Sequence, residues 1–368
     1  MTKARELAKL GEVMTNSQIG GRRNLIINGS QIVAQRGADN LNITSASGGT
    51  FATDRFKFYL SLGGTAQFDL QQVAEAPTGS GFSKSLKVSC DVTATLTANH
   101  YLFVEYNIEG QDVQQLKKGT SSAENVTLSF WLKSNKTASG QVNLRDHDNT
   151  RIISKTYTIS ASNTWQFVTL TFDGDTTGVI TNDNSKGLAL EFWLDSGTTY
   201  SSGATPTSWE ATSSADRNAT NFGLVSSTDN YWQITGVQLE VGSQATPFEH
   251  RSFGEELSLC QRYYFQKINA TSQPVGIGVY KTASQIRLNI EFPTMMRTAP
   301  SVITTDATNH FRAENQTDDF IDGNWGTLQM STSSGLIFSG GNVSGTQNSA
   351  TAVHSNSNDA RLAFNSEL

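Results

Sequence analysis

The sequence has few cysteines, no long apolar run and no apolar N-terminal segment. Only two of its 368 residues are cysteines, Cys90 and Cys260, so a disulfide framework is not expected and two buried thiols are the favoured interpretation. No stretch approaches the about 18 consecutive apolar residues of a membrane-spanning helix. The charged N-terminus also lacks the apolar core of a secretory signal. We therefore expect neither membrane insertion nor a disulfide-stapled fold.

Charge is also scarce. Charged residues make up 16% of the chain, against about 25% in typical globular proteins. The net charge of −6 and the isoelectric point near 5.4 provide no positive field for phosphates, so nucleic-acid binding is not expected. Because aromatic residues still make up 9% of the chain and the net charge is small, charge-driven disorder is not expected either.

Small polar residues replace the missing charge. Serine, threonine and asparagine together account for 111 residues, whereas a helical bundle would be rich in alanine, leucine, glutamate and lysine. Such residues suit the outward faces of strands and the turns between them. The composition predicts an all-β protein.

The first 23 residues form a separate segment. Leu7, Leu10 and Met14 recur at helical spacing within residues 2–14, which predicts a short helix with one apolar stripe. A helix of this length is marginal alone in water and needs a partner. It could pack on its own globular body, or it could join copies of the chain and anchor them to another protein. The polar linker that follows favours the second alternative.

From Asn24 to Arg251 the apolar residues alternate with polar ones. In Val126–Lys133 and again in Leu188–Asp195, every second residue is apolar, and Trp131 and Trp193 lie on the opposite, outward faces. Similar alternation occurs in residues 86–92, 102–108, 168–172 and 237–241. One apolar face per strand indicates antiparallel sheets packed on each other. We therefore predict a jelly-roll β-sandwich over residues 24–251.

A second domain is expected after a linking helix. Ser252 and Glu255 have the spacing of a capping box, and Leu257 and Cys260 continue an apolar stripe, so a helix is predicted over residues 252–265. Alternation returns in residues 286–292, and apolar residues persist to Phe364. The expected architecture is all-β: a jelly-roll β-sandwich followed by a smaller C-terminal β-sandwich in residues 266–368, with a short N-terminal helix and a linking helix.

Two segments at the ends of the predicted sandwich resemble a known family. These are Asn24–Gly37, followed by Asp54–Phe56, and Gln238–Tyr264. Both resemble signatures of bacteriophage tail-fibre and receptor-binding proteins, where they bracket a jelly roll similar to carbohydrate-binding modules. Thr2–Ala8 and Phe292–Val302 resemble further segments of such fibres. From the residues themselves we expect the second signature to maintain the fold, with His250 and Arg251 bonding loop carbonyls.

The resemblance implies partners and a location. It implies a homotrimer in the phage virion whose N-terminal segment docks on other tail proteins and which contacts a host surface polysaccharide. An amphipathic stripe needs a partner, so the candidate assembly residues lie in the two predicted helices. They are Leu7, Leu10, Met14, Leu257 and Cys260.

Motifs for catalysis are missing. The sequence has no Gly-x-Ser-x-Gly elbow, no phosphate-binding glycine loop and no His-Glu-x-x-His. The five histidines are scattered without metal-ligand spacing, so we expect no catalytic residue, no metal site and no cofactor. Asp146–Asn149 and Asp173–Asp175 could hold a structural calcium, as carbohydrate-binding jelly rolls often do. Ordinary turn bonding by Asp and Asn is the favoured alternative.

Aromatic residues beside short polar ones are the candidate sugar contacts, because sugars present both apolar C–H faces and hydroxyl edges. Trp131 and Trp193 could stack on a pyranose ring or lie under a loop or a neighbouring subunit, and the covered position is favoured. The other candidates lie in predicted loops. The full set is Trp131, Trp193, Tyr200, Trp209, His310, Arg312, Asn324 and Trp325.

These observations favour a short tail fibre or fibre tip that recognises a host glycan by multivalent, non-catalytic binding. Two alternatives remain open. The chain could be a structural decoration or fibre-connector protein of the particle, or it could be a polysaccharide depolymerase, which needs two carboxylates about 5–9.5 Å apart.

Overall fold

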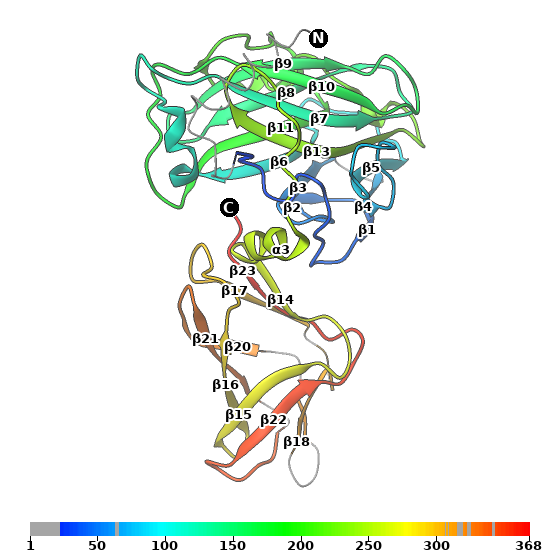
Figure 1. The fold of residues 1–368 in the computed structure, drawn as a ribbon. Coiled ribbons are helices and arrows are strands. Elements are labelled where there is room, and N and C mark those ends of the chain that lie inside the picture. The colour runs from blue at the N-terminus through cyan, green and yellow to red at the C-terminus, as the bar shows by residue number, and fades with distance from the viewer. Residues whose placement is uncertain are drawn as a thin grey trace. The chain divides into compact units, whose positions relative to one another are not determined.

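The structure, a computed structural model, describes residues 23–62, 66–305, 307, 309–314, 319–321, 325–340 and 343–368. The chain forms two units, one that ends at Phe253 and includes Leu368, and one formed by Gly254–Glu367 (Figure 1). The predicted helix with Leu7, Leu10 and Met14 lies outside the described residues. Among the described residues, no helix combines the length and the apolar character needed to cross a membrane.

The first unit contains two antiparallel sheets, and both are shown in Figure 1. In spatial order, the six-stranded sheet consists of β1 (Asp39–Ile43), β4 (Gln67–Val73), β5 (Ser85–Val92), β13 (Tyr231–Val241), β7 (Val126–Lys133) and β10 (Gln166–Phe172). The seven-stranded sheet consists of β12 (Glu210–Ala211), β9 (Arg151–Thr158), β8 (Ser139–Asp146), β11 (Lys186–Ser196), β6 (Tyr101–Glu109), β3 (Phe56–Ser61) and β2 (Ala46–Thr50).

The core lies between these sheets, as the alternating pattern predicts. Leu128, Phe130 and Leu132 of β7 are fully buried. The ring of Phe130 meets that of Phe192 from β11 edge to face, with centroids 5.4 Å apart. Because β7 and β11 belong to different sheets, this contact joins the two layers of the predicted jelly-roll sandwich.

The two signature segments lie against each other in the sandwich. The backbone N–H of Leu25 donates to the carbonyl of Leu239, and the side chain of Asn24 accepts from the Leu239 N–H. Arg251 donates from its guanidinium to the carbonyls of Asn24 and Ile26 at 2.7 and 3.2 Å. The predicted carbonyl bonding by Arg251 is therefore confirmed, and the two ends of the domain share one hydrogen-bond network.

The second unit is a smaller β-sandwich. Its three-stranded sheet consists of β14 (Tyr264–Ile268), β23 (Leu362–Asn365) and β17 (Ser301–Thr304). Its seven-stranded sheet consists of β19 (Asp319–Ile321), β18 (Phe311–Glu314), β22 (Ala350–Ser355), β15 (Pro274–Thr282), β16 (Gln285–Glu291), β21 (Ser334–Gly340) and β20 (Trp325–Met330). Leu362 and Phe364 of the small sheet share one buried cluster with Tyr280, Ile286 and Ile337 of the large one.

The linking helix is shorter than predicted. It is α3 (Phe253–Gln261), and Tyr264, which lies within the predicted range of the helix, begins β14 instead. Cys260 is fully buried within the single chain, so its proposed role in assembly is wrong, since a thiol without exposed surface cannot contact another copy. Leu257 is half-buried, and its role remains a prediction.

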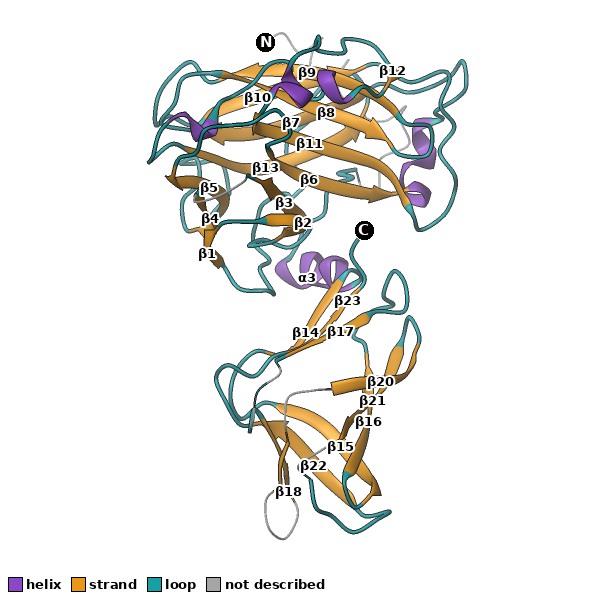
Figure 2. Ribbon diagram, turned by 180° about the vertical axis from the view of Figure 1, so that it is seen from behind, coloured by secondary structure: helices purple, strands orange, loops and turns teal. Residues whose placement is uncertain are grey.

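Short helical turns join the strands of the first unit, and Figure 2 shows them in the connections rather than in the sheets. They are η1 (Gly110–Leu116), α2 (Thr198–Ser201), η2 (Ser214–Asp216) and η3 (Leu224–Ser226).

Candidate functional site

Trp131 lies in a groove on the outer face of the six-stranded sheet. The register places it beside Phe167 of β10 and Thr235 of β13, and the Trp131 and Phe167 rings lie 5.3 Å apart. The groove, here called the Trp131 groove, has a volume of about 340 Å³. Its lining residues are Ser80, Phe82, Ser129, Trp131, Phe167, Gly236, Thr246, Pro247, Phe248 and His250.

A glycine makes room for the aromatic side chains. The register of β13 against β7 shifts between Thr235 and Gln238, and Gly236 in this bulge has a φ of +62°. A Cβ at Gly236 would lie 2.6 Å from the ring of Phe82 and 3.2 Å from that of Trp131. Any larger residue would therefore meet both a left-handed backbone and two rings.

The opposite wall of the Trp131 groove comes from two loops. Phe82 precedes β5, whereas Phe248 and His250 follow β13. The Phe82 ring lies 4.8 Å from that of Phe248 and 5.2 Å from that of His250. The sequence suggested that His250 bonds loop carbonyls, but its ring is exposed and packs on these phenylalanines. Sequence reasoning missed this wall because no local pattern places the two loops together.

The composition of the groove suits a polar ligand with apolar faces. Four Phe and Trp rings supply flat apolar surface, and the imidazole of His250 and the hydroxyl-bearing residues Ser80, Ser129 and Thr246 lie among them. Phe167 is 52% exposed, so its ring is open to a ligand. The ten lining residues include no Asp, Glu, Lys or Arg. The site therefore favours an uncharged partner.

Trp193 lies on the outer face of the seven-stranded sheet but is fully buried. Its ring stacks on that of Phe103 at 4.8 Å, and the guanidinium of Arg217 lies 4.7 Å from it. Its indole N–H donates to Glu191 at 2.9 Å. The proposed stacking of a sugar on Trp193 is therefore wrong in this structure, because protein groups cover its faces.

Beneath Trp193 lies a buried ionic network. Glu191 is fully buried and accepts from Arg145 at 2.6 Å and from Arg217 at 2.9 Å. Burial alone would raise the pKa of the Glu191 carboxyl, but the two guanidinium groups hold it well below its usual value. Glu191 thus stays ionised and fixes Arg217 over Trp193.

Tyr200 and Trp209 pack against other side chains. Tyr200 is half-buried, with its ring 5.3 Å from that of Trp193 and 5.6 Å from that of Tyr101. The Trp209 indole donates to the carbonyl of Asp173 at 2.6 Å. The ammonium of Lys118 lies 3.6 Å from the centre of the Trp209 ring, a cation–π contact. Neither residue lines the Trp131 groove.

Two of the aspartates proposed for calcium do converge, but on a lysine. The Lys118 ammonium lies 3.0 Å from Asp175 and 3.4 Å from Asp146, and Arg151 adds a 2.8 Å contact to Asp175. Lys118 is 4% exposed. Burial lowers the pKa of the lysine, whereas the two carboxylates oppose that change. The protein's own ammonium thus stands where the calcium hypothesis needs a cation, and the donor set does not fit a metal.

Outside this cluster, the described residues offer no metal site either. Asp148 accepts from the backbone N–H of Thr181 at 2.7 Å, which is ordinary loop bonding. Within the described ranges, no group of three or more His, Cys, Asp or Glu side chains could hold a metal ion.

The C-terminal candidates separate in the structure. Trp325 begins β20, is 3% exposed and packs edge to face on Phe311 at 5.6 Å, so its proposed receptor contact is wrong. Asn324 lies outside the described residues. His310 is half-buried, and its Nδ1 lies 2.8 Å from the hydroxyl of Thr305. Arg312 lines a pocket.

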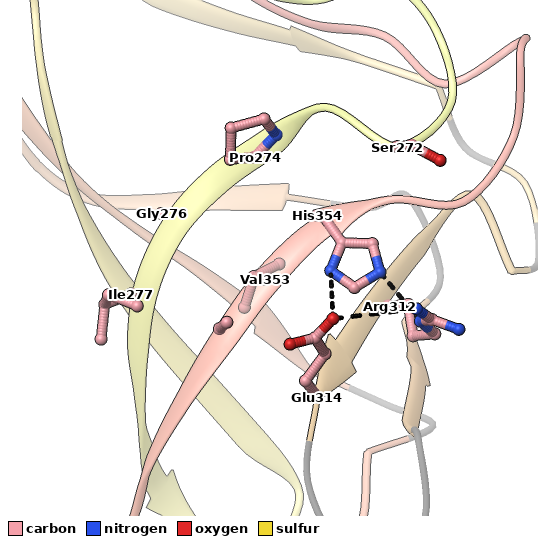
Figure 3. Close-up of a pocket in the computed structure, with 9 residues that line it drawn as sticks. Ser272, Pro274, Gly276, Ile277, Arg312, Glu314, Val353 and His354 are labelled. Carbon is pink, nitrogen blue, oxygen red and sulfur yellow. Dashed lines mark hydrogen bonds and ion pairs between the residues drawn. The ribbon is translucent and has the colours of Figure 1, made fainter.

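That pocket, here called the Arg312 pocket, lies on the large sheet of the second unit and has a volume of about 590 Å³. Figure 3 shows His354 between Arg312 and Glu314, with Pro274 and Ile277 on the neighbouring strand. Its lining residues are Ser272, Pro274, Gly276, Ile277, Arg312, Glu314, Ala352, Val353 and His354.

A pair of carboxyl groups bears on the depolymerase alternative. Asp91 and Asp69 are hydrogen bonded to each other. Glycosidases hold their two carboxyl groups about 5–9.5 Å apart, because a sugar carbon or a water must fit between them. A directly hydrogen-bonded pair is too close for that arrangement, so this pair does not support glycoside cleavage.

The same pair predicts a pH effect on stability. Burial, the hydrogen bond that protonated Asp91 donates to Asp69, and the charges of Asp69 and Asp229 raise the pKa of Asp91 to about 6. Between about pH 4 and pH 6 the native state therefore retains a proton that the unfolded chain has lost, so this pair contributes stability that falls as the pH rises. Asp91→Asn is expected to remove that slope from the free energy of unfolding. Identical slopes in urea denaturation of both proteins across this window would contradict the assignment.

Comparisons with known proteins give distant structural similarities. No protein-family model matches the sequence, and no curated protein matches it. The enzymatically active domain of tailspike protein 4 from bacteriophage CBA120 is 15% identical over 59% of this chain, with a TM-score of 0.30. The match spans 21% of that tailspike chain.

Two carbohydrate-binding modules are similar at the same level. A CBM4 structure is 13% identical over 58% of this chain and 97% of its own, with a TM-score of 0.30. The family 11 module of the Clostridium thermocellum cellulase Lic26A-Cel5E is 11% identical over 58% of this chain and 98% of its own, with a TM-score of 0.27. Because these similarities are distant, the function has to be argued from the chemistry of the sites.

Proposed function

We propose that this protein binds a neutral glycan, without cleaving it, through the Trp131 groove. The observation that carries the proposal is the convergence of five rings and three hydroxyl-bearing residues in one groove of about 340 Å³. A pyranose presents an apolar face that can lie on a ring and hydroxyls that can bond the groove's edges. The lack of charged groups among the ten lining residues favours an uncharged sugar.

The biological setting follows from the sequence resemblance. The signature segments Asn24–Gly37 and Gln238–Tyr264 resemble those of phage tail fibres, and they support a role as a virion receptor-binding protein. In this proposal the chain is a homotrimer, its N-terminal segment docks on other tail proteins, and the groove meets a host surface polysaccharide. Three copies raise the avidity of weak sites without new contacts.

Removing a ring of the groove tests the proposal. Trp131→Ala is expected to weaken binding of neutral polysaccharides about tenfold or more, because loss of a buried aromatic surface removes about 1.5–3 kcal/mol. Phe167→Ala should act in the same direction. Affinity electrophoresis in gels containing β-glucan, galactan or xylan measures the change.

The matched control is Phe253→Ala. Phe253 is 57% exposed and lies outside the groove, so its removal takes away a similarly exposed ring without changing the site. If the wild type, Trp131→Ala and Phe253→Ala are retarded to the same extent in every gel, the proposal that the Trp131 groove binds the glycan is refuted. Retardation of none of them would favour the alternative of a structural particle protein. New reducing ends after incubation with polysaccharide would instead favour a depolymerase.

A further inference from the structure

We propose that the Arg312 pocket is a second saccharide site, which recognises a pair of adjacent hydroxyls on a neutral sugar. The ligand class rests on the proposed function, whereas the site itself is independent of the Trp131 groove. Its surface is ionic and aliphatic rather than aromatic. Each chain would then carry two chemically different glycan sites.

The pocket is built by two rows of side chains across three strands. The register places Arg312 of β18 beside His354 of β22, and His354 beside Pro274 of β15. In the next row, Glu314 pairs with Ala352 and Ala352 with Ile277. Because side chains two residues apart along a strand share one face, both rows face the same side of the sheet.

A bulge and a small residue leave the hollow. The register of β15 against β22 shifts between Pro274 and Gly276. Ala352, which faces the same side as Ile277, has only a methyl group, so the space between Pro274 and Ile277 stays open. Bulges often lie beside binding sites, where they redirect side chains.

The polar side chains hold one another in place. Arg312 donates from Nε to Nε2 of His354 at 2.8 Å, so Nε2 is the acceptor and the imidazole proton is assigned to Nδ1. His354 Nδ1 faces Glu314 Oε1 at 3.5 Å, and an Arg312 Nη lies 3.8 Å from the same oxygen. Figure 3 shows the three side chains converging in this way. The guanidinium is thereby oriented before a ligand arrives.

This arrangement matches a vicinal diol. A guanidinium only donates and a carboxylate only accepts, so together they can bond the oxygens and the protons of two neighbouring hydroxyls. Both groups still meet solvent, since Arg312 is 32% and Glu314 54% exposed. The opposite charges balance, which disfavours a strongly anionic sugar. Ile277, which is 69% exposed, offers aliphatic surface to the sugar's C–H groups.

A contact with a second copy of the chain is the rival use of this face, because Val279 on the same strand is also 45% exposed. The hollow of about 590 Å³ and the polar triad at its centre favour the sugar. A flat apolar face would suit a protein partner better. We therefore treat subunit contact as an outcome of the test.

The test uses the full chain and five substitutions: Trp131→Ala, Arg312→Ala, Glu314→Gln, Ile277→Asp and the matched control Arg287→Ala. Arg287 lies on the neighbouring strand β16 and bonds Gln285, outside the pocket. The probes are β-glucan, galactan and xylan, each also after periodate oxidation, which cleaves vicinal diols. Thermal unfolding confirms that each variant folds.

We expect the Trp131→Ala variant to keep residual binding to the polysaccharides. Adding Arg312→Ala or Glu314→Gln to this variant should weaken that residual binding at least tenfold. Periodate-oxidised polysaccharide should not be bound by the Trp131→Ala variant. Arg287→Ala should leave it unchanged. If Trp131→Ala alone abolishes binding, the second site is wrong and the groove stands. If only the pocket variants weaken binding, the pocket stands and the groove fails. If Ile277→Asp lowers the molecular mass measured by sedimentation while Arg312→Ala and Glu314→Gln keep full polysaccharide binding, this surface is a contact between copies of the chain. That result would refute the second saccharide site.

Discussion

Replacing Lys118 by methionine is expected to lower the free energy of unfolding of the first unit by about 3–5 kcal/mol at pH 7. The Lys118 ammonium is 4% exposed and lies within 3.4 Å of both Asp146 and Asp175. Methionine fills a similar volume but leaves two buried carboxylates with less compensating charge. Urea denaturation measures the loss.

The deficit should shrink as the pH falls towards 4. Lys118 is one of the groups that lower the pKa of Asp175, so its loss makes protonation of that carboxyl easier in the native state and less costly to folding. Lys117→Met is the matched control. Lys117 pairs with Glu124 but is 53% exposed, so its loss should change stability by less than about 1 kcal/mol. Equal losses of stability from the two substitutions would show that the buried cluster of Lys118, Asp146 and Asp175 does not stabilise the first unit.

Asn24→Ala is expected to lower the stability of the same unit by about 3 kcal/mol or more. The buried side chain of Asn24 donates to the carbonyl of Val237 and accepts from the backbone N–H groups of Ile26 and Leu239, at 2.9–3.1 Å. Alanine leaves these three buried groups without that partner, and each unsatisfied group costs about 1–3 kcal/mol. Chemical denaturation followed by tryptophan fluorescence measures the change.

The control for this prediction is Asn99→Ala. Asn99 is exposed and accepts one hydrogen bond from Thr199, so its removal should cost at most about 1 kcal/mol. If Asn24→Ala is as mild as Asn99→Ala, the contact between the two signature segments does not stabilise the sandwich.

The candidate site shows how far local patterns reach. Trp131 and Trp193 occupy equivalent positions in two similar strands, and alternation correctly places both on outward faces. Yet Trp131 lines a groove, whereas Trp193 is fully buried. The difference comes from Phe103 and Arg217, which are distant in sequence and lie against Trp193. No period within a strand carries that information.

The aspartates show the same limit. Asp146 and Asp175 are drawn together as the calcium hypothesis required, but the third member is Lys118, from a loop that no acidic motif marks. Arg312 was singled out from the sequence, whereas His354 and Glu314, which orient it, were not, because they become its neighbours only through strand pairing.

Local alternation of apolar and polar residues predicts the all-β class, the buried faces of strands such as Val126–Lys133 and a second β-rich region, because strand alternation is a local property of the chain. The scarcity of charge and the abundance of Ser, Thr and Asn likewise followed from composition. Only the tertiary structure decided which aromatic rings stay open, which carboxylates are neutralised and where the two pockets form. Those features depend on loops and strands brought together from distant positions, and sequence spacing does not encode such contacts.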